Sequence, residues 1–396
     1  MVSWPARTFR TVPWTPSSRR GSSADRRLTE VDVSVPPHIA GLPFTAVASR
    51  ELERAMREVR TLEETYADVL RPLAGFLVRT ESVASSKIEH VTASVEDFAR
   101  ALGGVRSNSS AVSMVSAGRA MTKLIDTAHP VITLDAILAA HHALMSEDPS
   151  ERVSAGRLRD VQNWIGGSDH SPRGALYVPP PAETVDDLMA DLITFANADD
   201  VHPVAQAAIV HAQFETIHPF TDGNGRIGRA LLGAVLRRRG VARSTVVPVA
   251  SALSADTEHY FDSLTAYRDG DADRIVEDIA LSTQIAARES EHTAALFRTL
   301  PSDWRAAASP RRGSGAEDVI DHLLALPVFT VEQMAHETHR DEQTVFRAVA
   351  RLEDSGVIHE VTDRKRDRVF AARDVLDELD DLDLRIRNAI TAERRG

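Results

Sequence analysis

Several features are missing from this chain, and each absence narrows its class. The 396 residues contain no cysteine, which excludes disulfides and cysteine-ligated zinc and fits a reducing, cytoplasmic setting. No run approaches the roughly 18 apolar residues of a membrane span, and the N-terminus has no apolar signal core. We therefore expect a cytoplasmic protein with no membrane partner.

The charge balance separates the N-terminus from the rest. The net charge is −12, which argues against non-specific nucleic-acid binding by the whole chain. The opening segment is different, because it combines Pro and Ser with six arginines. These are Arg7, Arg10, Arg19, Arg20, Arg26 and Arg27. We interpret residues 1–42 as a mobile basic arm, and a solvated tail is favoured over a nucleic-acid-binding one.

The most informative segment spans twelve positions, 218–229. It combines an imidazole, a carboxylate, two glycines, an amide and two guanidiniums: His218, Asp222, Gly223, Asn224, Gly225, Arg226 and Arg229. Apolar residues recur at helical spacing before it, over 204–217, and after it, over 227–236. The pattern predicts a tight loop between two helices, with the second helix starting near Asn224.

These residue types suit a site for a triphosphate and a metal ion. The glycines let the backbone approach a ligand, and the first N–H groups of the second helix bind anions. Arg226 and Arg229 share a helix face and suit phosphate oxygens. Asp222 is a hard oxygen ligand for Mg²⁺ held jointly with phosphates. His218, with an ordinary pKa of about 6.5, suits a general base. On this evidence, transfer of AMP and transfer of a phosphoryl group both stay open.

The segment closely resembles the signature of the Fic family, H-x-F-x-[DE]-G-N-G-R-x-x-R. All eight specified positions match: His218, Phe220, Asp222, Gly223, Asn224, Gly225, Arg226 and Arg229. The resemblance covers roughly residues 43–287. It implies transfer of AMP from Mg-ATP to a hydroxyl of a target protein, with release of pyrophosphate.

The resemblance also implies a role for each motif residue. His218 would deprotonate the target hydroxyl, and Asp222 would hold Mg²⁺. The α-phosphate would be held by Asn224 and the loop amides. The β- and γ-phosphates would be held by Arg226 and Arg229. Phe220 would anchor the loop in the core.

A second segment resembles the family's inhibitory motif, [ST]-x-x-x-E-[GN]. Ser85 and Glu89 match it, whereas His90 departs from the usual Gly or Asn. The resemblance implies that Glu89 pairs with Arg229 and displaces the γ-phosphate. A carboxylate and a phosphate compete for one guanidinium. A glycine at position 90 would favour a left-handed helix cap, which histidine adopts less readily.

Between the two motifs, Gly, Ser and Pro break the helical pattern from Gly166 to Pro181. We expect a short hairpin there, resembling the family's flap, which binds the target segment by strand addition. The docking residues are then Ile165, Gly166, Gly167, Tyr177 and Val178.

Two consecutive histidines, His141 and His142, fall on a predicted apolar helix. We expect a structural role for both.

The C-terminal region resembles a winged helix-turn-helix. Helices are expected over 318–326, 330–337 and 341–353, followed by a strand from Gly356 and a basic turn. Candidate DNA contacts are Thr344, Arg347, Arg351, Lys365 and Arg366. Acidic residues share the third helix, so DNA and a protein partner are equally favoured. An amphipathic acidic helix should follow over 374–383.

We therefore predict a mainly α protein, with a Fic-type helical bundle, a short β-hairpin flap and a C-terminal winged helix-turn-helix. The predicted divisions are the arm 1–42, a helical lobe with the inhibitory helix over 43–125, a catalytic core over 126–300, a linker over 301–316, and the winged helix and tail over 317–396. The expected ligands are ATP, Mg²⁺ and a target protein, and a homodimer stays open. The alternative is a nucleotide-sensing transcriptional regulator that acts through the winged helix.

Overall fold

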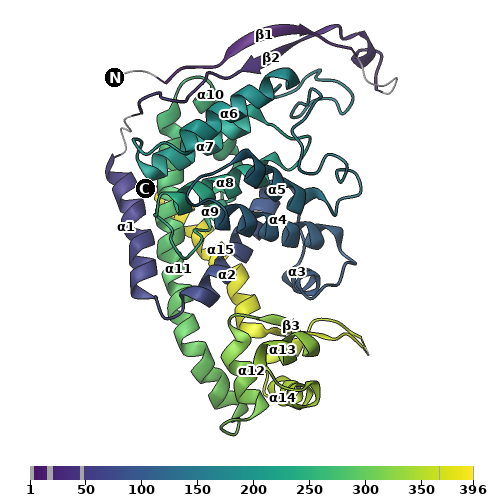
Figure 1. The fold of residues 1–396 in the computed structure, drawn as a ribbon, viewed down its shortest axis with the longest axis vertical. Coiled ribbons are helices and arrows are strands. Elements are labelled where there is room, and N and C mark those ends of the chain that lie inside the picture. Colours follow the sequence, from purple (N-terminus) through teal and green to yellow (C-terminus); the bar gives the residue numbers. More distant parts are fainter. Residues whose placement is uncertain (1–3, 16–20, 45–48, 365, 396) are drawn as a thin grey trace. The chain divides into compact units, whose positions relative to one another are not determined.

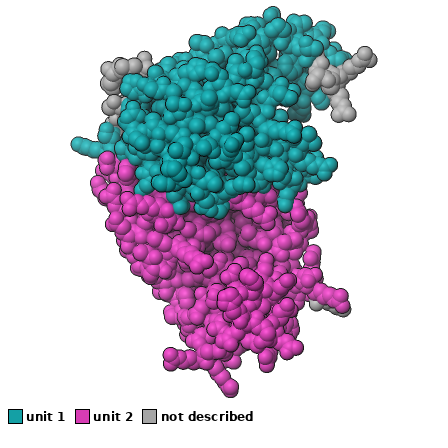
Figure 2. All heavy atoms as spheres, in the orientation of Figure 1, with its two compact units in different colours: residues 1–52, 120–240, 257–280 teal, residues 53–119, 241–256, 281–396 magenta. Residues whose placement is uncertain are grey.

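The structure, a computed structural model, describes residues 4–15, 21–44, 49–364 and 366–395. As predicted, it is mainly helical, with two small antiparallel sheets (Figure 1). The contacts divide the chain into two compact units (Figure 2). Unit 1 comprises residues 1–52, 120–240 and 257–280, and unit 2 comprises residues 53–119, 241–256 and 281–396. Neither unit is a continuous stretch, so they do not coincide with the linear domains predicted from the sequence. Within the described ranges, no helix is long and apolar enough to cross a bilayer.

Unit 1 contains the predicted phosphate motif. Its elements are β1 (Thr8–Pro13), η1 (Asp25–Arg27), β2 (Glu30–Val35), α5 (Leu134–Met145), η2 (Ala182–Thr184), α6 (Val185–Ala196), α7 (Pro203–Ile217), α8 (Asn224–Arg238) and α10 (Thr257–Arg268). Every residue of α7 from Val204 onward is buried, so this helix forms the centre of the unit. Helix α8 packs along it closely. A Cβ at Gly228 would lie 2.5 Å from Glu215 Oε1, so only glycine fits there.

The N-terminal segment differs from the predicted mobile arm. Strands β1 and β2 pair antiparallel, from Thr8 opposite Val35 to Pro13 opposite Glu30. Trp4 is 8% exposed and stacks against core rings of unit 1. The prediction was wrong for the described part of the arm because some of its apolar side chains, such as Trp4 and Val33, are buried despite the basic composition. Arg19 and Arg20 lie outside the described residues.

Unit 2 collects most of the remaining elements. They are α1 (Ser49–Thr65), α2 (Leu70–Ile88), α3 (Val95–Leu102), α4 (Ser109–Asp126), α9 (Val249–Leu253), α11 (Ala272–Ala308), α12 (Gly315–Leu323), β3 (Val328–Thr330), α13 (Val331–Thr338), α14 (Glu342–Asp354), β4 (Ile358–Glu360), β5 (Val369–Ala372) and α15 (Arg373–Glu393). The units share three of these helices, because α1 and α11 begin and α4 ends in unit 1.

Helix α11 extends through much of the predicted linker. It continues past Pro301 and ends at Ala308, so only residues 309–314 connect it to α12. The cause is an apolar stripe that persists at helical spacing, with Phe297, Leu300 and Trp304 all buried. The Trp304 indole N–H also donates to Asp374 at 2.7 Å. The prediction of a linker over 301–316 was based on Ser, Pro and Gly content and overlooked this stripe.

The three predicted C-terminal helices and the strands after them are present, and the structure adds β3, an unpredicted strand between α12 and α13. The strands form one antiparallel sheet in the order β3-β5-β4. Thr330 and Gln333 form a reciprocal capping box at the start of α13, and Asp341 caps α14. The tail forms α15, which is longer than predicted. The winged-helix assignment itself stays a prediction.

Helix α2 ends in the left-handed turn that the inhibitory motif suggested. His90 has φ of 59°, its N–H donates to the Lys87 carbonyl, and the Val91 N–H reaches back to the Ser86 carbonyl at 3.0 Å. These are the two hydrogen bonds of a Schellman motif. The inhibitory motif has Gly or Asn at this position, and both residues adopt the left-handed conformation more readily than histidine does.

We predict that His90→Gly stabilises the protein. Histidine in the left-handed region costs about 1 kcal/mol that glycine does not incur. Urea unfolding should show the free energy of unfolding rising by about that amount. His339 is also left-handed, with φ of 53°, at the end of α13, so His339→Gly is a matched control that should behave alike. A destabilised His90→Gly variant would mean that the imidazole makes contacts that outweigh the backbone strain.

Candidate active site

The motif starts where α7 ends. His218 is the C-cap of this helix and adopts a left-handed conformation, with φ of 50° and ψ of 60°. Its N–H still donates to the Phe214 carbonyl at 2.8 Å, and its ring is 16% exposed. Histidine in this conformation is uncommon and requires support from its surroundings. The turn directs the chain out of α7 and leaves the imidazole partly accessible.

Asn224 closes the loop that follows. Its side-chain oxygen accepts the Phe220 N–H at 2.8 Å, and its amide donates to the Phe220 carbonyl at 2.9 Å. Both residues are buried, Phe220 completely, as expected for an anchor. These contacts give Asn224 the role of shaping the loop, and its predicted contact with the α-phosphate stays a prediction.

The tip of the loop carries the candidate metal ligand. Gly223 has φ of 77°, and a Cβ there would lie 3.0 Å from Leu144. The side chain of Asp222 is 57% exposed. Its Oδ1 accepts the Gly223 N–H at 2.5 Å, and its Oδ2 lies 3.9 Å from Arg226 Nη2. A left-handed turn that favours glycine therefore presents a carboxylate to solvent beside a guanidinium.

Two guanidiniums lie on the first turns of α8. Arg226 and Arg229 are 7% and 3% exposed. The N-terminal end of a helix already carries a partial positive charge, and burial strengthens electrostatic interactions. The predicted shared face therefore lies inside the unit, where it concentrates positive charge beside the loop.

His141 holds the loop from the facing helix, α5. Its Nδ1 accepts the Gly156 N–H at 2.9 Å, so its Nε2 carries the proton and donates to the Asp222 carbonyl at 3.1 Å. Its ring stacks on Phe220 with centroids 3.7 Å apart. Burial lowers its pKa to about 4, so the ring is neutral at pH 7. The structural role expected for His141 is therefore to hold the motif loop in place.

Arg159 supports the same loop from the flap side, and sequence reasoning assigned it no role. It is 4% exposed, and burial lowers its pKa to about 10. Its guanidinium donates to the His218 carbonyl at 2.9 Å and to the Pro180 carbonyl at 2.6 Å. Its own N–H donates to the Pro219 carbonyl at 2.9 Å. One buried cation thus joins the left-handed turn to the flap, and a long-range contact of this kind leaves no local pattern.

The flap pairs as predicted but more sparsely than a regular hairpin. Its pairing is limited to isolated bridges, Ile165 with Tyr177 and Ser168 with Ser171. Gly166 and Gly167 lie between the two bridges, and each has a φ of 74°. The Tyr177 hydroxyl donates to the Thr216 carbonyl at 2.6 Å, which fastens the flap to α7. We refer to residues 164–181 as the flap.

The candidate inhibitory residues belong to unit 2. Ser85 is buried on α2, and Glu89 caps the end of that helix with an exposed side chain. The Schellman turn at His90 fixes the backbone that presents this carboxylate.

The candidate DNA contacts have different surroundings. The Arg351 guanidinium donates to the carbonyls of Ala308 and Ser309 and so stabilises the end of α11. Arg347 donates to the Gln343 carbonyl on its own helix. Thr344 bonds its cap residue Asp341, and Lys365 lies outside the described residues.

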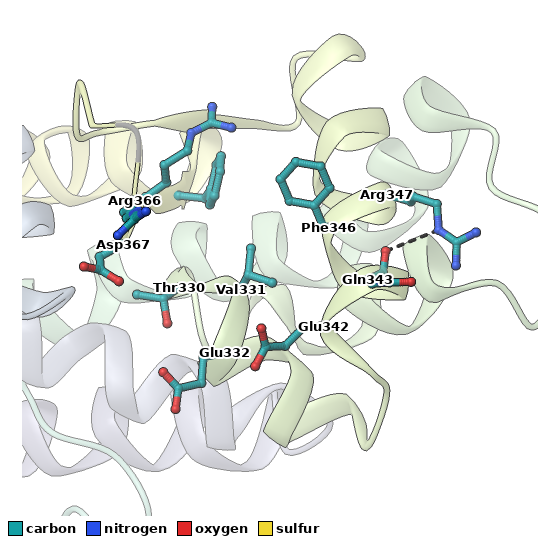
Figure 3. A pocket seen from close by; sticks show the side chains of 11 residues that line it. Thr330, Val331, Glu332, Glu342, Gln343, Phe346, Arg347, Arg366 and Asp367 are labelled. Atoms are coloured by element: carbon teal, nitrogen blue, oxygen red, sulfur yellow. Dashed lines mark hydrogen bonds between the residues drawn. The ribbon is translucent and has the colours of Figure 1, made fainter.

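A cavity of about 700 Å³ lies beside α14, as Figure 3 shows. Three acidic residues and three arginines contribute to its lining: Glu332, Glu342, Asp367, Arg347, Arg366 and Arg368. Phe346 faces it and is 56% exposed. This mixture of charges around an aromatic ring differs from the uniformly basic surface that DNA phosphates favour.

Comparison with known proteins agrees with this geometry. Residues 131–236 match the model of the Fic/DOC family. A stretch of 140 residues is 30% identical to protein adenylyltransferase fic-1 of Caenorhabditis elegans, covering 34% of this chain and 25% of that protein. A stretch of 156 residues is 31% identical to protein adenylyltransferase Fic of Nematostella vectensis, covering 39% and 33%. The match thus spans about a quarter to a third of the length of these relatives.

The fold agrees over a longer stretch. The crystal structure of a Fic family protein from Desulfovibrio desulfuricans G20 superposes with a TM-score of 0.54 and 23% identity, covering 83% of this chain and 97% of that one. The fold and the motif loop together define a Fic domain. This chain contains that domain at residues 131–236, which include α5 to α7 and almost all of α8.

We predict that His141 makes folding stability sensitive to acid. Its pKa is about 4 in the folded protein and about 6.5 when unfolded, so the unfolded chain takes up the proton first as pH falls. Its contribution is present above pH 6.5 and decreases towards pH 4, by up to about 3 kcal/mol. His141→Phe retains a ring against Phe220 but cannot titrate.

Urea unfolding of both proteins between pH 7 and pH 4 measures this effect. The wild type should approach the variant in stability as the pH falls. His292→Phe, which changes an exposed histidine on α11, should leave the wild-type pH dependence unchanged. A constant difference between wild type and His141→Phe across this range would contradict a neutral, buried imidazole.

Proposed function

We propose that this protein transfers AMP from Mg-ATP to a hydroxyl group of a target protein. One observation carries the proposal: a partly exposed imidazole and an exposed carboxylate lie on one loop whose backbone is fixed by buried side chains. The buried arginines Arg226 and Arg229 lie in the first turns of α8, directly after this loop. The match to the Fic/DOC family and the names of the relatives further support it.

His218 is the proposed general base. The target hydroxyl oxygen attacks the α-phosphorus of ATP and forms the new P–O bond. The bond from that phosphorus to the oxygen bridging to the β-phosphate breaks, and pyrophosphate leaves. His218 accepts the hydroxyl proton. Glu215 Oε2 lies 3.9 Å from His218 Nδ1, close enough to favour the imidazolium that results.

The remaining motif residues bind the nucleotide. The N-terminal amides of α8 and the guanidiniums of Arg226 and Arg229 supply positive charge for the phosphates. Preorganised charge of this kind stabilises the negative charge that develops on the leaving pyrophosphate. The residues by themselves suit phosphoryl transfer equally well, and the choice of AMP rests on the relatives.

Asp222 is the proposed ligand of Mg²⁺. Its exposed carboxylate suits a metal ion that takes one or two protein oxygens and shares its other positions with phosphates and water. Among the described residues no cluster of three or more metal-ligating side chains is found, which fits a metal that arrives with the nucleotide. The bound ion would neutralise phosphate charge.

We predict that His218→Ala lowers transfer by about 10²–10⁴-fold and leaves ATP binding nearly intact, because the base acts on the acceptor and not on the nucleotide. Label from [α-³²P]ATP on protein and the affinity for a fluorescent ATP analogue are the two measurements. His292→Ala is the matched control. Undiminished transfer in His218→Ala would remove this residue from the mechanism. ATP binding without any transfer by the wild type would favour the nucleotide-sensing regulator.

We further propose that Glu89 restrains the enzyme by competing with the γ-phosphate for Arg229. The support is the sequence pattern of Ser85 and Glu89 and the exposed carboxylate at a fixed helix end. A carboxylate and a phosphate at one guanidinium exclude each other through charge repulsion.

Removing the Glu89 carboxylate should raise label transfer severalfold or more. Both Glu89→Gly and Glu89→Gln remove the charge, and only the second retains the side-chain size. Glu64→Gln changes an exposed glutamate on α1 and is the control. Adding Arg229→Ala to Glu89→Gln should abolish the gain. If both Glu89 variants fold, bind ATP and transfer at the wild-type rate, Glu89 is not inhibitory.

For the C-terminal helices and sheet we propose a protein partner in preference to DNA. The exposed Phe346 ring and the mixed acidic and basic lining of the adjoining cavity favour a protein surface. Arg351 is engaged at the end of α11, which leaves fewer arginines for phosphates. The regulator alternative would instead require DNA binding that weakens steeply with salt.

A further inference from the structure

Three separate parts of the N-terminal segment contact the flap. The Ser34 N–H on β2 donates to the Val178 carbonyl at 2.9 Å. The Trp14 ring meets the Trp164 ring edge-on, with centroids 5.5 Å apart. Asp25, in η1 between the two strands, accepts hydrogen bonds from flap side chains. All three contacts lie within unit 1.

The pleat of the strands explains why Ser34 reaches the flap. Tyr177 exchanges backbone hydrogen bonds with Ile165, so the N–H and C=O of the next residue, Val178, point to the opposite side. The Ser34 N–H occupies that side, so the Tyr177–Val178 strand lies between Ile165 and β2. The Val178 side of the flap is thereby occupied, so an added acceptor segment would have to pair along the opposite side, beyond Ile165.

Asp25 provides the polar part of the contact. Its carboxylate is 4% exposed and accepts four hydrogen bonds. Two come from Ser22 in its own turn, at 2.7 and 2.6 Å. The other two come from the flap, from the Ser171 hydroxyl at 2.8 Å and Arg173 Nε at 3.1 Å. The hydroxyls of Ser22 and Ser171 hold the pKa of Asp25 well below its usual range, so the carboxylate stays charged.

The burial of the N-terminal segment indicates that it is a fixed part of unit 1 and not a strap that can detach. Val33 and Ser34 on β2 are 0% and 2% exposed, and Trp4 is inserted among core rings of unit 1. The Arg7 N–H donates to the Arg268 carbonyl at 2.7 Å. Releasing such a segment would expose apolar surface and break charged hydrogen bonds together. The segment therefore belongs to the folded unit.

We propose that the β1–β2 hairpin with η1 is a built-in support of the flap, to which β2 adds a third strand, and that Asp25 is a positioning residue that holds the flap in its acceptor-binding conformation. The effect of Asp25 on acceptor binding rests on the proposed transfer reaction. The support that the hairpin gives to the flap does not depend on any activity. The partner is an extended segment of the acceptor protein, which gains a rigid edge to pair with.

Hydrogen exchange of the full-length protein tests the structural part. Asp25→Ala removes all four hydrogen bonds, and Ser171→Ala removes one from the flap side. Exchange of flap amides, residues 164–178, should rise roughly tenfold or more in Asp25→Ala and less in Ser171→Ala. Amides of α7 and α8 should be unchanged. Asp32→Asn is the control, because Asp32 is exposed on β2 and bonds Thr11 on β1. Unchanged flap exchange, or an equal rise throughout unit 1, would overturn the proposal.

A kinetic measurement tests the consequence. Label transfer from [α-³²P]ATP to lysate protein is followed against lysate concentration and, separately, against ATP. Asp25→Ala should need more acceptor for half-maximal rate, with an unchanged ATP dependence and maximal rate. Faster transfer in Asp25→Ala would overturn the proposal, because it would identify the hairpin as an inhibitory strap. If the wild type transfers no label, the proposed reaction fails, and the exchange measurement still decides whether the hairpin supports the flap.

Discussion

The site depends on a left-handed turn at His218 that is held by hydrogen bonds from buried side chains to main-chain atoms. Asn224 binds the Phe220 backbone, Arg159 binds the His218 carbonyl, and His141 binds the Asp222 carbonyl. Each of these three side chains is itself fixed, because it is almost fully buried. The loop can therefore keep the strained conformation at His218 without help from a ligand, and little reorganisation is needed when charge develops.

The same contacts explain why the site tolerates buried charge. Arg159 is buried, but it replaces its water with carbonyl oxygens, which compensates much of the desolvation cost. His141 takes the other course and stays neutral because burial lowers its pKa. The loop thus combines one permanent charge and one neutral donor, and both act on backbone oxygens. Substitutions at either residue should affect the geometry of the motif before they affect its chemistry.

The position and local form of the motif loop were readable from the sequence, but the contacts that support the loop were not. Residue types at fixed spacing predicted the loop and the start of α8 at Asn224, because these follow from local pattern, and the resemblance to the Fic signature implied the burial of Phe220. Arg159 and Asp25 act across tens or more than a hundred residues, and such contacts leave no periodicity. The predictions of a mobile N-terminal arm and of a linker over 301–316 were wrong for a related reason. Both were based on composition and overlooked a few apolar residues that are buried in the structure. The role predicted for Glu89 stays a prediction.

The central claim is that the loop transfers AMP and not a phosphoryl group. Incubating the protein with Mg²⁺, cell lysate and ATP labelled either at the α- or at the γ-phosphate separates the two. The account predicts that protein gains label from [α-³²P]ATP and none from [γ-³²P]ATP, and that pyrophosphate is released in equal amount. Label from the γ-position on protein, with ADP as the product, would contradict it.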